Sequence, residues 1–406
     1  MARRASTSSA LPAGVAFAAV IVAALNLRAG IASVGPVLGD VLAAFGAAGG
    51  LAGVITAMPG AFFAVMGLSA VPLARRLGLT RTLTLGMGLV LVGLSFRPWV
   101  SSALPFIALT ALVVAGIALA NVLLPAWIKL HGGSHVVTLM TINGSLLGAS
   151  GALGPLSAAL YDGPQAWRHA LFFWVYLGLA QVIVWLFVAW RQGFDFPGKQ
   201  QVKEQPRRQV ALWKAPTALF LTLFFGLQSM NAYSQMGYLP QILIDAGARQ
   251  SVASTALAVV GGLGIVGGLV MPTLIDRAES LTPHLIGIAA CAVFGYLGLI
   301  LAPTAAPLVW SVFLGLGGWA FPAALTLIVA RSKSPEVTAR LSGFVQPFGY
   351  VIAALGPLLI GLVYSPEDPQ WTPVLLALLL ASVIQGLVGI RAARRVYIDD
   401  ELARAN

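Results

Sequence analysis

Residues 14–38 of the 406-residue chain read GVAFAAVIVAALNLRAGIASVGPVL, and this stretch decides the fold class. A helix needs about 20 predominantly apolar residues to cross the hydrocarbon core of a bilayer, and this run exceeds that length. It holds one charged side chain, Arg28, and one amide, Asn26. These polar residues stand where a signal-peptide cleavage site would be expected, so the run is typical of a retained membrane helix.

The composition extends this interpretation to the whole chain. Apolar residues make up 58% and charged residues 9% of the sequence, and the mean hydropathy is +0.89. Soluble domains carry roughly a quarter charged residues, so these charges are too few to cover a water-exposed globule of this size. A soluble enzyme, a secreted module and a disordered scaffold are therefore excluded. The sequence predicts an all-α integral membrane protein whose solvent is the lipid bilayer.

Apolar runs separated by charged or Pro/Gly-rich turns predict twelve transmembrane helices. Their limits are 14–38, 48–72, 80–97, 102–127, 136–160, 168–190, 214–239, 250–275, 283–301, 306–330, 338–364 and 371–390. The longest polar segment falls between the sixth and seventh. We therefore predict an N-terminal six-helix bundle at residues 1–190, a cytoplasmic linker at 191–213, and a C-terminal six-helix bundle with a cytoplasmic tail at 214–406.

The basic residues predict the orientation. Of the 24 Lys and Arg residues, 20 lie in segments on one predicted side of the membrane. Arg97, Arg168 and Arg249 lie on the other side, and Arg28 lies inside the first span. Lys and Arg in short loops mark the cytoplasmic side, which predicts a multi-pass protein of the cell inner membrane with both termini cytoplasmic. Nucleic acid is not an expected partner, because its recognition needs clustered basic residues with stacking aromatics, whereas these basic residues lie in short loops between apolar runs.

The two predicted halves repeat one another. Residues 152–155 (ALGP) recur at 354–357, and Leu-Asn at 25–26 corresponds to Leu-Gln at 227–228. Gly67 and Pro72 recur as Gly267 and Pro272. Parallel six-helix repeats are the layout of major facilitator transporters, whose substrate site lies between the halves near mid-membrane. The sequence thus predicts two pseudo-symmetric bundles around a central site.

Nothing in the sequence points to catalysis, a metal or a cofactor. Residues 262–267 match the dinucleotide pattern G-x-G-x-x-G, but they lie inside an apolar helix without the preceding strand that the motif requires. All 13 carboxylates fall in loops, the linker, the termini or at span edges. Proton-coupled transporters commonly keep a carboxylate within the membrane. Three possibilities therefore stay open: uncoupled transport, movement of the proton with the substrate, or a less usual proton carrier.

Arg28 is the prime candidate for a substrate contact, because a charge at that depth normally faces a cavity or a partner. A planar guanidinium favours a small anion or a nitro or carboxylate group. The alternative is an arginine bonded to backbone carbonyls at a helix break near Gly30. Asn26 points to nearly the opposite side of a regular helix, so it shares the site only if the helix loosens there. Further buried polar candidates, each of which could instead form interhelical hydrogen bonds, are Asn121, Gln228, Asn231, Gln346 and Tyr350.

Several of these residues lie in stretches that resemble the cyanate and 2-nitroimidazole transporter family of the major facilitator superfamily. The stretches are 25–28 (LNLR), 121–129 (NVLLPAWIK), 226–229 (GLQS) with Tyr233, and 341–346 (LSGFVQ) running into Gly349-Tyr350. The loop after the second span departs from the superfamily pattern, because Arg75 stands where an Asp is usual, whereas Asp276-Arg277 in the second half keeps it. The resemblance implies small, planar, polar or weakly acidic substrates and adds Tyr233 to the candidate site.

The sequence as a whole predicts a monomeric secondary active transporter that works by alternating access on a small-molecule substrate, anionic or bearing a nitro or carboxylate group. One alternative is a multidrug efflux antiporter, which would need a larger and often acidic cavity. Another is a membrane receptor that binds a ligand without moving it.

Overall fold

The computed structural model describes residues 11–47, 49–196, 211–333 and 335–404. Within these ranges the chain is helical and contains no strand. Residues 197–210, which make up most of the predicted linker, lie outside the described residues. The prediction of an all-α membrane protein is confirmed.

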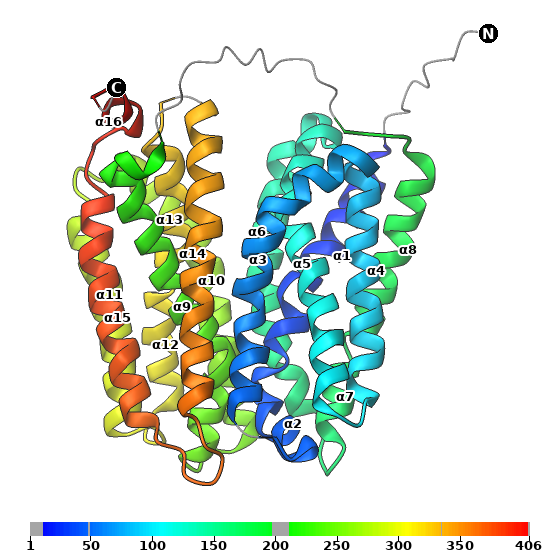
Figure 1. The fold of residues 1–406 in the computed structure, drawn as a ribbon, viewed down its shortest axis with the longest axis vertical. Coiled ribbons are helices and arrows are strands. Elements are labelled where there is room, and N and C mark those ends of the chain that lie inside the picture. Colours follow the sequence, from blue (N-terminus) through cyan, green and yellow to red (C-terminus); the bar gives the residue numbers. More distant parts are fainter. Residues whose placement is uncertain (1–10, 48, 197–210, 334, 405–406) are drawn as a thin grey trace.

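The first half of the chain builds the helices on the right of Figure 1. They are α1 (Ala13–Ala32), α2 (Leu38–Phe45), α3 (Gly49–Leu77), α4 (Leu79–Phe96), α5 (Ala103–His131), α6 (Val136–Leu156), α7 (Ala166–Phe172) and α8 (Val175–Arg191). Short 3₁₀ turns connect some of these helices, among them η1 (Gly35–Val37) after α1 and η2 (Arg97–Trp99) after α4.

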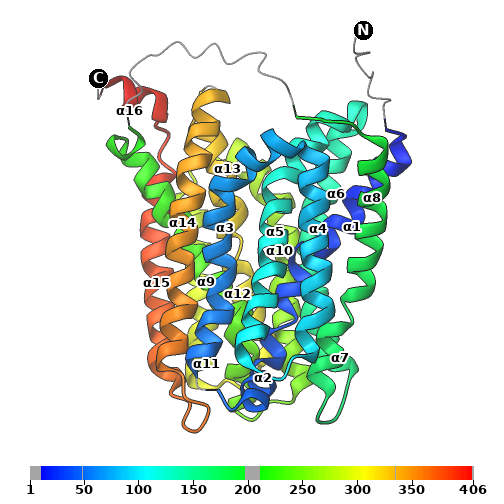
Figure 2. The same ribbon diagram turned by 45° about the vertical axis from the view of Figure 1, so that its right-hand side comes forward.

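The second half builds the helices on the left (Figure 1). They are α9 (Pro216–Asp245), α10 (Gln250–Arg277), α11 (Thr282–Leu301), α12 (Pro307–Gly317), α13 (Ala320–Ala330), α14 (Pro335–Val363), α15 (Trp371–Ala392) and α16 (Ile398–Arg404). The view in Figure 2 shows α3 and α14 side by side at the boundary between the halves.

Among the described residues, ten helical segments are long and apolar enough to cross a membrane. α6 and α9, of 21 and 30 residues, run alongside them through the full height of the molecule (Figures 1 and 2). These two helices carry amides in their middle turns, including Asn143, Gln228 and Asn231. Together the segments make the twelve membrane crossings that the sequence predicts.

Three predicted spans differ in detail from the structure. The first continues beyond residue 38 through η1 and α2 to Phe45. The sixth is divided into α7 and α8 at residues 173–174, and the tenth into α12 and α13 at Gly318 and Trp319. Gly317, at the end of α12, lies so close to α11 that a Cβ there would stand 2.7 Å from the Cβ of Ala292.

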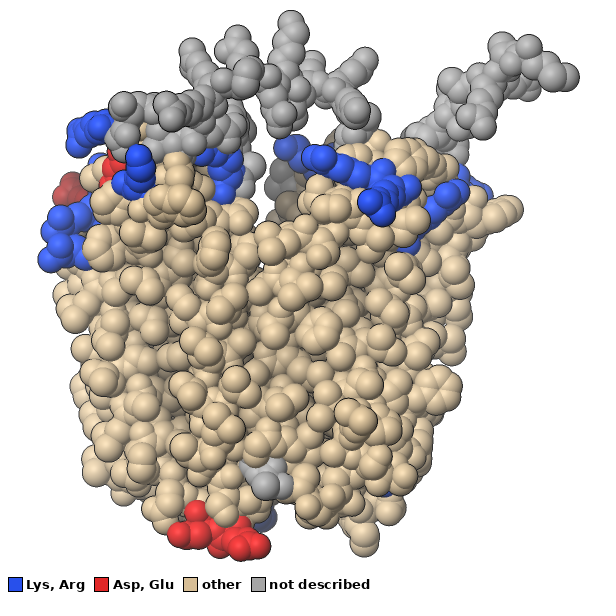
Figure 3. Space-filling model, viewed as in Figure 1, with Lys and Arg blue, Asp and Glu red and all other residues tan. Residues whose placement is uncertain are grey.

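The two faces of the molecule differ in charge. We call the face that carries the ends of α8 and α15, with α16, the linker face, and the face that carries α2 and α7 the opposite face (Figure 1). Basic side chains cover the linker face over both halves, whereas a patch of acidic side chains stands out on the opposite face (Figure 3). Arg97, which the sequence places on the outer side of the membrane, is fully buried in η2, where its Nη2 donates to Gly30 O at 2.7 Å.

Glycines let the two halves meet closely on the side of the opposite face. A Cβ added to Gly35 would lie 2.2 Å from the carbonyl oxygen of Met236, and one added to Gly60 would lie 2.8 Å from the backbone nitrogen of Ala354. Small residues allow such backbone contact between membrane helices. We call these contacts of η1 with α9 and of α3 with α14 the glycine seam.

Polar contacts reinforce the glycine seam. The side-chain amide of Gln250 in the second half donates to Pro36 O in the first. Thr56 of α3 and Tyr238 of α9 are joined through their hydroxyls at 3.3 Å. Toward the linker face the halves separate, and a hollow opens between them (Figure 3). The structure is therefore closed at the opposite face and open at the linker face.

Candidate functional site

A cavity of about 400 Å³ lies between the two halves. We call it the central cavity. Its volume is within the range of about 300–1,000 Å³ that small-molecule sites occupy. The first half contributes side chains from α1, α3, α5 and α6, and the second from α9 through α15. Most of the surface is apolar, and the described polar side chains that line it are Arg28, Asn121, Gln228, Ser229, Asn231, Tyr233, Gln235, Thr326, Tyr350, Ser382 and Gln385.

Arg28 enters the central cavity from α1. The helix is held in place by its backbone, because the N–H groups of Arg28 and Ala29 both donate to Ser150 Oγ of α6, at 3.1 and 2.8 Å. The guanidinium lies over the ring of Phe321, 5.4 Å from its centroid, in the geometry of a cation–π contact. No carboxylate among the described residues forms an ion pair with Arg28. Its positive charge therefore remains available to a ligand in the cavity.

Aromatic rings form a wall of the same cavity. Phe63 of α3 stacks on Tyr350 of α14 at 5.1 Å and lies 6.5 Å from Tyr233 of α9, with ring planes inclined by 25° and 7°. The two tyrosine rings are 6.3 Å apart at 30°. Rings from three helices thus share nearly one orientation beside a guanidinium, an arrangement that suits a planar solute.

The amides of α9 belong to a hydrogen-bond network with α11 and α15. The hydroxyl of Tyr296 donates to Asn231 Oδ1 at 2.9 Å and accepts a bond from Gln235 Nε2 at 2.9 Å. Asn231 Nδ2 donates to Gln385 Oε1 at 3.2 Å. For Asn231 the interhelical bonding that the sequence left open is present in the structure. The side-chain amide of Gln228 donates within α9, to the Ser229 hydroxyl.

The structure brings six of the eight predicted site residues to the central cavity. Asn121 joins the five discussed above, and its side chain also donates to Ile117 O at 3.1 Å within α5. Asn26 does not line the cavity: α1 remains a regular helix past Gly30, and the Asn26 amide packs against Gly178 of α8. Gln346 does not line it either, because its amide turns back to Ser342 Oγ one turn earlier on α14.

The sequence reasoning missed several residues of the site. In the sequence, Phe63 and Phe321 are ordinary apolar residues of their spans, and only the packing of α3 and α13 brings them to the central cavity. Tyr296 and Gln385 are single polar residues in apolar runs. A buried amide such as Gln385 was a usable clue, because it also needs a hydrogen-bonding partner within the membrane.

No carboxylate is present among the described side chains that line the central cavity. Asp40, Asp245 and Asp276 lie on helices near the two faces of the molecule. Asp245 accepts hydrogen bonds from Gln241 and Trp371 at the opposite face. The chemistry of the cavity is therefore that of one cation, several amides and hydroxyls, and aromatic rings.

Comparison with known proteins gives relatives that cover nearly the whole chain. An uncharacterized transporter of Bacillus subtilis (strain 168), YycB, is 32% identical over 93% of both chains. The 2-nitroimidazole transporter of Escherichia coli (strain K12) is 29% identical, over 94% of this chain and 95% of the relative. The cyanate transport protein CynX of the same organism is 25% identical, over 85% and 89%. The resemblance to the cyanate and 2-nitroimidazole transporters is confirmed.

The fold is shared with solved transporter structures. A bacterial homologue of the human lysosomal transporter Spinster, in an inward-facing and unoccupied conformation, superimposes with a TM-score of 0.75 at 16% identity, over 95% of this chain and 98% of that one. These relatives and neighbours are transporters rather than enzymes. The model of the Major Facilitator Superfamily matches residues 16–357. The chain is a multi-pass membrane protein that belongs to the Major Facilitator Superfamily.

Proposed function

We propose that the protein is a secondary active transporter of a small, planar solute that is anionic or bears a nitro or carboxylate group. The observation that carries this proposal is the side chain of Arg28, which faces the central cavity without a carboxylate partner among the described residues. A bidentate guanidinium matches the two oxygens of a carboxylate or nitro group. The neighbouring rings of Phe63, Tyr233 and Tyr350 match the flat face of a nitroimidazole-like molecule, and the charge of Arg28 suits a small anion such as cyanate.

The proposal includes the direction in which the cavity faces. Lys and Arg residues gather at the linker face (Figure 3), and positive residues favour the cytoplasmic side of a membrane. We propose that the linker face and both termini lie in the cytoplasm. In this orientation the central cavity opens to the cytoplasm. Transport would alternate this state with one in which residues 1–190 and 214–406 rock as two bundles, the glycine seam parts and the linker face closes.

Binding and flux measurements test the proposal together. Purified protein is heated with cyanate, a 2-nitroimidazole or benzoate, with imidazole and a neutral benzyl alcohol as matched controls. Ligands that bind the folded state raise the melting temperature. We expect only the anionic or nitro compounds to do so. Proteoliposomes should then exchange the same labelled solute across the membrane.

The alternatives predict other outcomes. A multidrug antiporter would be stabilised by large cationic or lipophilic compounds in preference to small anions. A non-transporting receptor would be stabilised by the small anions but would give no exchange in proteoliposomes. Either result would overturn the proposed function.

A further inference from the structure

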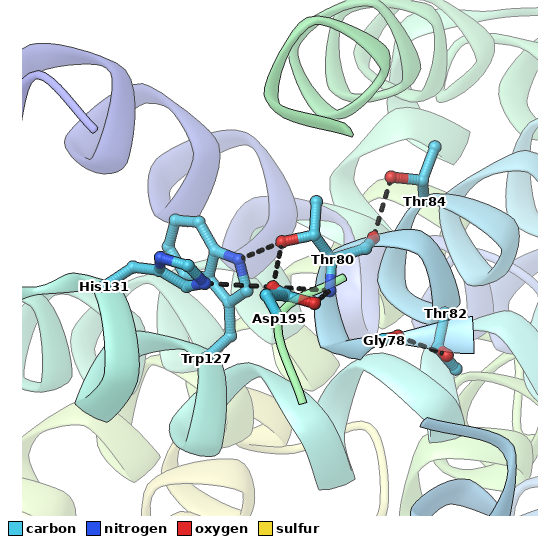
Figure 4. Close-up of polar contacts among 7 residues, drawn as sticks. All are labelled: Gly78, Thr80, Thr82, Thr84, Trp127, His131 and Asp195. Carbon is cyan, nitrogen blue, oxygen red and sulfur yellow. Dashed lines mark hydrogen bonds and ion pairs between the residues drawn. The ribbon is translucent and has the colours of Figure 1, made fainter. Parts of the chain in front are cut away.

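A buried carboxylate, that of Asp195, lies in the first half of the molecule at the linker face. Asp195 follows α8 and reaches the N-terminus of α4 (Figure 4). Its oxygens accept the backbone N–H of Thr80 at 3.1 Å and the Thr80 hydroxyl at 2.5 Å. His131, the last residue of α5, lies 2.9 Å away, and Trp127 Nε1 bonds the same Thr80 hydroxyl at 2.8 Å. We call these four residues the Asp195 cluster.

The repeat of the halves identifies the corresponding place in the second half. There α13 ends at Ala330 and is followed by Arg331, and Arg395 comes shortly after the end of α15. His131 and Arg331 are 200 positions apart, as are Asp195 and Arg395. The offset is close to those of the repeated motifs. Where the first half holds a carboxylate, the second half therefore holds a guanidinium.

These arginines line a groove of about 820 Å³ at the linker face. We call it the arginine groove. It lies between the ends of α10, α13 and α15 and the start of α11. Its described charged residues are Asp276, Glu279, Arg331, Arg394 and Arg395. Pro272 and Thr326 line both this groove and the central cavity.

Among the described residues, the guanidiniums of Arg331 and Arg395 donate to backbone carbonyls. Arg331 donates to Ala393 O at 2.7 Å and Ala330 O at 3.3 Å, and Arg395 donates to Ala278 O at 2.9 Å. Arg331 is 7% exposed, and its buried Nε has no hydrogen-bond partner. Burial, and next the charge of Arg395, lower the pKa of Arg331 below its ordinary value. The positive charges of Arg331 and Arg395 therefore repel one another.

The nearby carboxylates do not neutralise this pair. Asp276 and Glu279 line the groove, but neither forms an ion pair within the described chain. The acidic residues of α16 are engaged elsewhere. Glu401 accepts the N–H and hydroxyl of Thr217 at the start of α9, and Asp399 and Asp400 both contact Lys333.

We propose that the arginine groove binds a phosphate group, which takes the place that the Asp195 carboxylate occupies in the first half. Arginine forks bind phosphate oxygens in a bidentate manner, and two adjacent forks suit a group with several such oxygens. The phosphate can belong to a phospholipid headgroup, because the groove lies at the end of the membrane-spanning helices, or it can be free phosphate. This site is separate from the substrate site and does not depend on the transported solute.

The test measures thermal unfolding of the full chain in a neutral detergent, with inorganic phosphate as the probe and chloride at equal ionic strength as its control. Phosphate should raise the melting temperature in a saturable manner. Arg395→Gln should weaken phosphate binding, so that the half-saturating phosphate concentration rises at least tenfold. Arg391→Gln removes an exposed charge from the same end of α15 outside the groove and should change it less than twofold.

A second variant gives the groove the carboxylate that the first half has at the corresponding position. Arg395→Asp places a carboxylate beside Arg331, as Asp195 stands beside His131. The melting temperature without phosphate should then rise above that of Arg395→Gln, and the response to phosphate should disappear. This variant separates binding from a simple loss of folding, because it predicts a gain of stability.

Native mass spectrometry distinguishes the two sources of phosphate. If a lipid supplies it, the protein should retain phosphatidylglycerol in preference to phosphatidylcholine, and Arg395→Gln should lose that preference. If free phosphate is the ligand, the saturable phosphate response should appear without any preference between lipids. The proposal is overturned if the protein neither prefers phosphatidylglycerol nor responds to phosphate. It is also overturned if Arg395→Gln and Arg391→Gln change these measurements to the same extent.

Discussion

At the scale of single residues, Arg28 could bind the solute through its guanidinium, stabilise α1, or do both. Its backbone N–H fixes α1 to Ser150, whereas its guanidinium lies over the ring of Phe321. The side chain can therefore be removed without breaking the bonds that join α1 to α6. This separates the role of the charge from the folding of the helix.

We predict that Arg28→Ala remains folded and binds the solute about tenfold to a hundredfold more weakly. This range corresponds to the loss of about 1.5–3 kcal/mol, the usual contribution of a hydrogen bond to a charged group. Arg28→Lys should recover only part of the affinity, since it keeps the charge but lacks the planar fork. Size-exclusion chromatography and ligand titration of one preparation measure both properties.

The control is Arg249→Ala, which removes an exposed arginine from the opposite face and should leave binding unchanged. An Arg28→Ala protein that is well folded and binds with normal affinity would remove Arg28 from the site. Aggregation of the same variant would indicate instead that the arginine is a structural element of α1.

Asp195 is the second residue with a specific expectation. Burial raises the pKa of its carboxyl, but hydrogen bonds from His131 and from the hydroxyl and N–H of Thr80 outweigh this and lower the pKa below its ordinary value. The ionised form is therefore favoured in the folded state. Its stabilising effect is present above the unfolded pKa of about 3.9 and is lost as the pH falls through the lower, folded value.

We predict that Asp195→Asn lowers the free energy of unfolding at pH 7 by about 1–3 kcal/mol, because the buried donors of Thr80 lose a charged acceptor. The difference from the unsubstituted protein should shrink as the pH is brought below about 4. Denaturant melts at several pH values measure it. Asp162→Asn, an exposed carboxylate, is the matched control, and an equal effect of both variants would contradict the role of the Asp195 cluster.

At the scale of elements, the glycine seam decides which face of the molecule is closed. η1 and α9 meet at backbone distance because position 35 has no side chain, and α3 meets α14 in the same way at Gly60. These contacts join the two halves, so any change that separates them favours the alternative, opposite-face-open arrangement. The seam is thus the element-level feature on which alternating access would depend.

We predict that Gly35→Ala shifts the molecule toward opening at the opposite face. Its Cβ would stand 2.2 Å from Met236 O in the present state, and overpacking of this kind costs about 1–3 kcal/mol, or roughly a 5- to 150-fold change in population. Spin labels at Asp162→Cys and Glu367→Cys, on opposite-face loops of the two halves, should show a longer distance component. Cys291 is replaced by serine beforehand.

Gly88→Ala provides the comparison for this experiment, because nothing lies within 4 Å of a Cβ at that position. It should leave the distance distribution as it was. Identical distributions for Gly35→Ala and Gly88→Ala would show that the seam does not control opening.

At the scale of the whole molecule, the uneven distribution of charge predicts how the protein sits in the membrane. A cysteine at Arg404→Cys, on the linker face, should react with an impermeant maleimide only after cells are permeabilised. Glu367→Cys, on the opposite face, should react in intact cells. Labelling of both in permeabilised cells is the control, and labelling of Arg404→Cys from outside intact cells would reverse the proposed orientation.

Much of this molecule follows from local properties of the sequence. Each membrane span needs about 20 apolar residues, so the twelve crossings could be predicted from composition alone. The division of the tenth span into α12 and α13 was not predicted, because its apolar run continues through Gly318 and Trp319 without a charge or proline between them. Arg28 stands out for an equally local reason, since an isolated charge in an apolar run is costly unless it has a partner or a cavity.

The membership of the central cavity depends on contacts between helices. From the sequence, Asn26 could share the site with Arg28 only if the helix loosened between them, but α1 stays regular and turns only Arg28 to the cavity. Gln346 could not be excluded in advance, because its bond to Ser342 requires a particular side-chain conformation. The partners of Asn231 come from α11 and α15, 65 and 154 residues away. Periodicity places a residue on a helix face but does not say what that face meets.

The sequence by itself determined that this protein is a helical membrane protein of two repeated halves with one deeply placed cation. Those properties depend on hydrophobicity, charge and repetition, which can be read directly from the order of the residues. Only the tertiary structure decided which face is closed, that Arg97 is buried, and that Arg331 and Arg395 share a groove where the first half holds Asp195. Each of these depends on the distance between segments far apart in the chain, and that distance is set by packing.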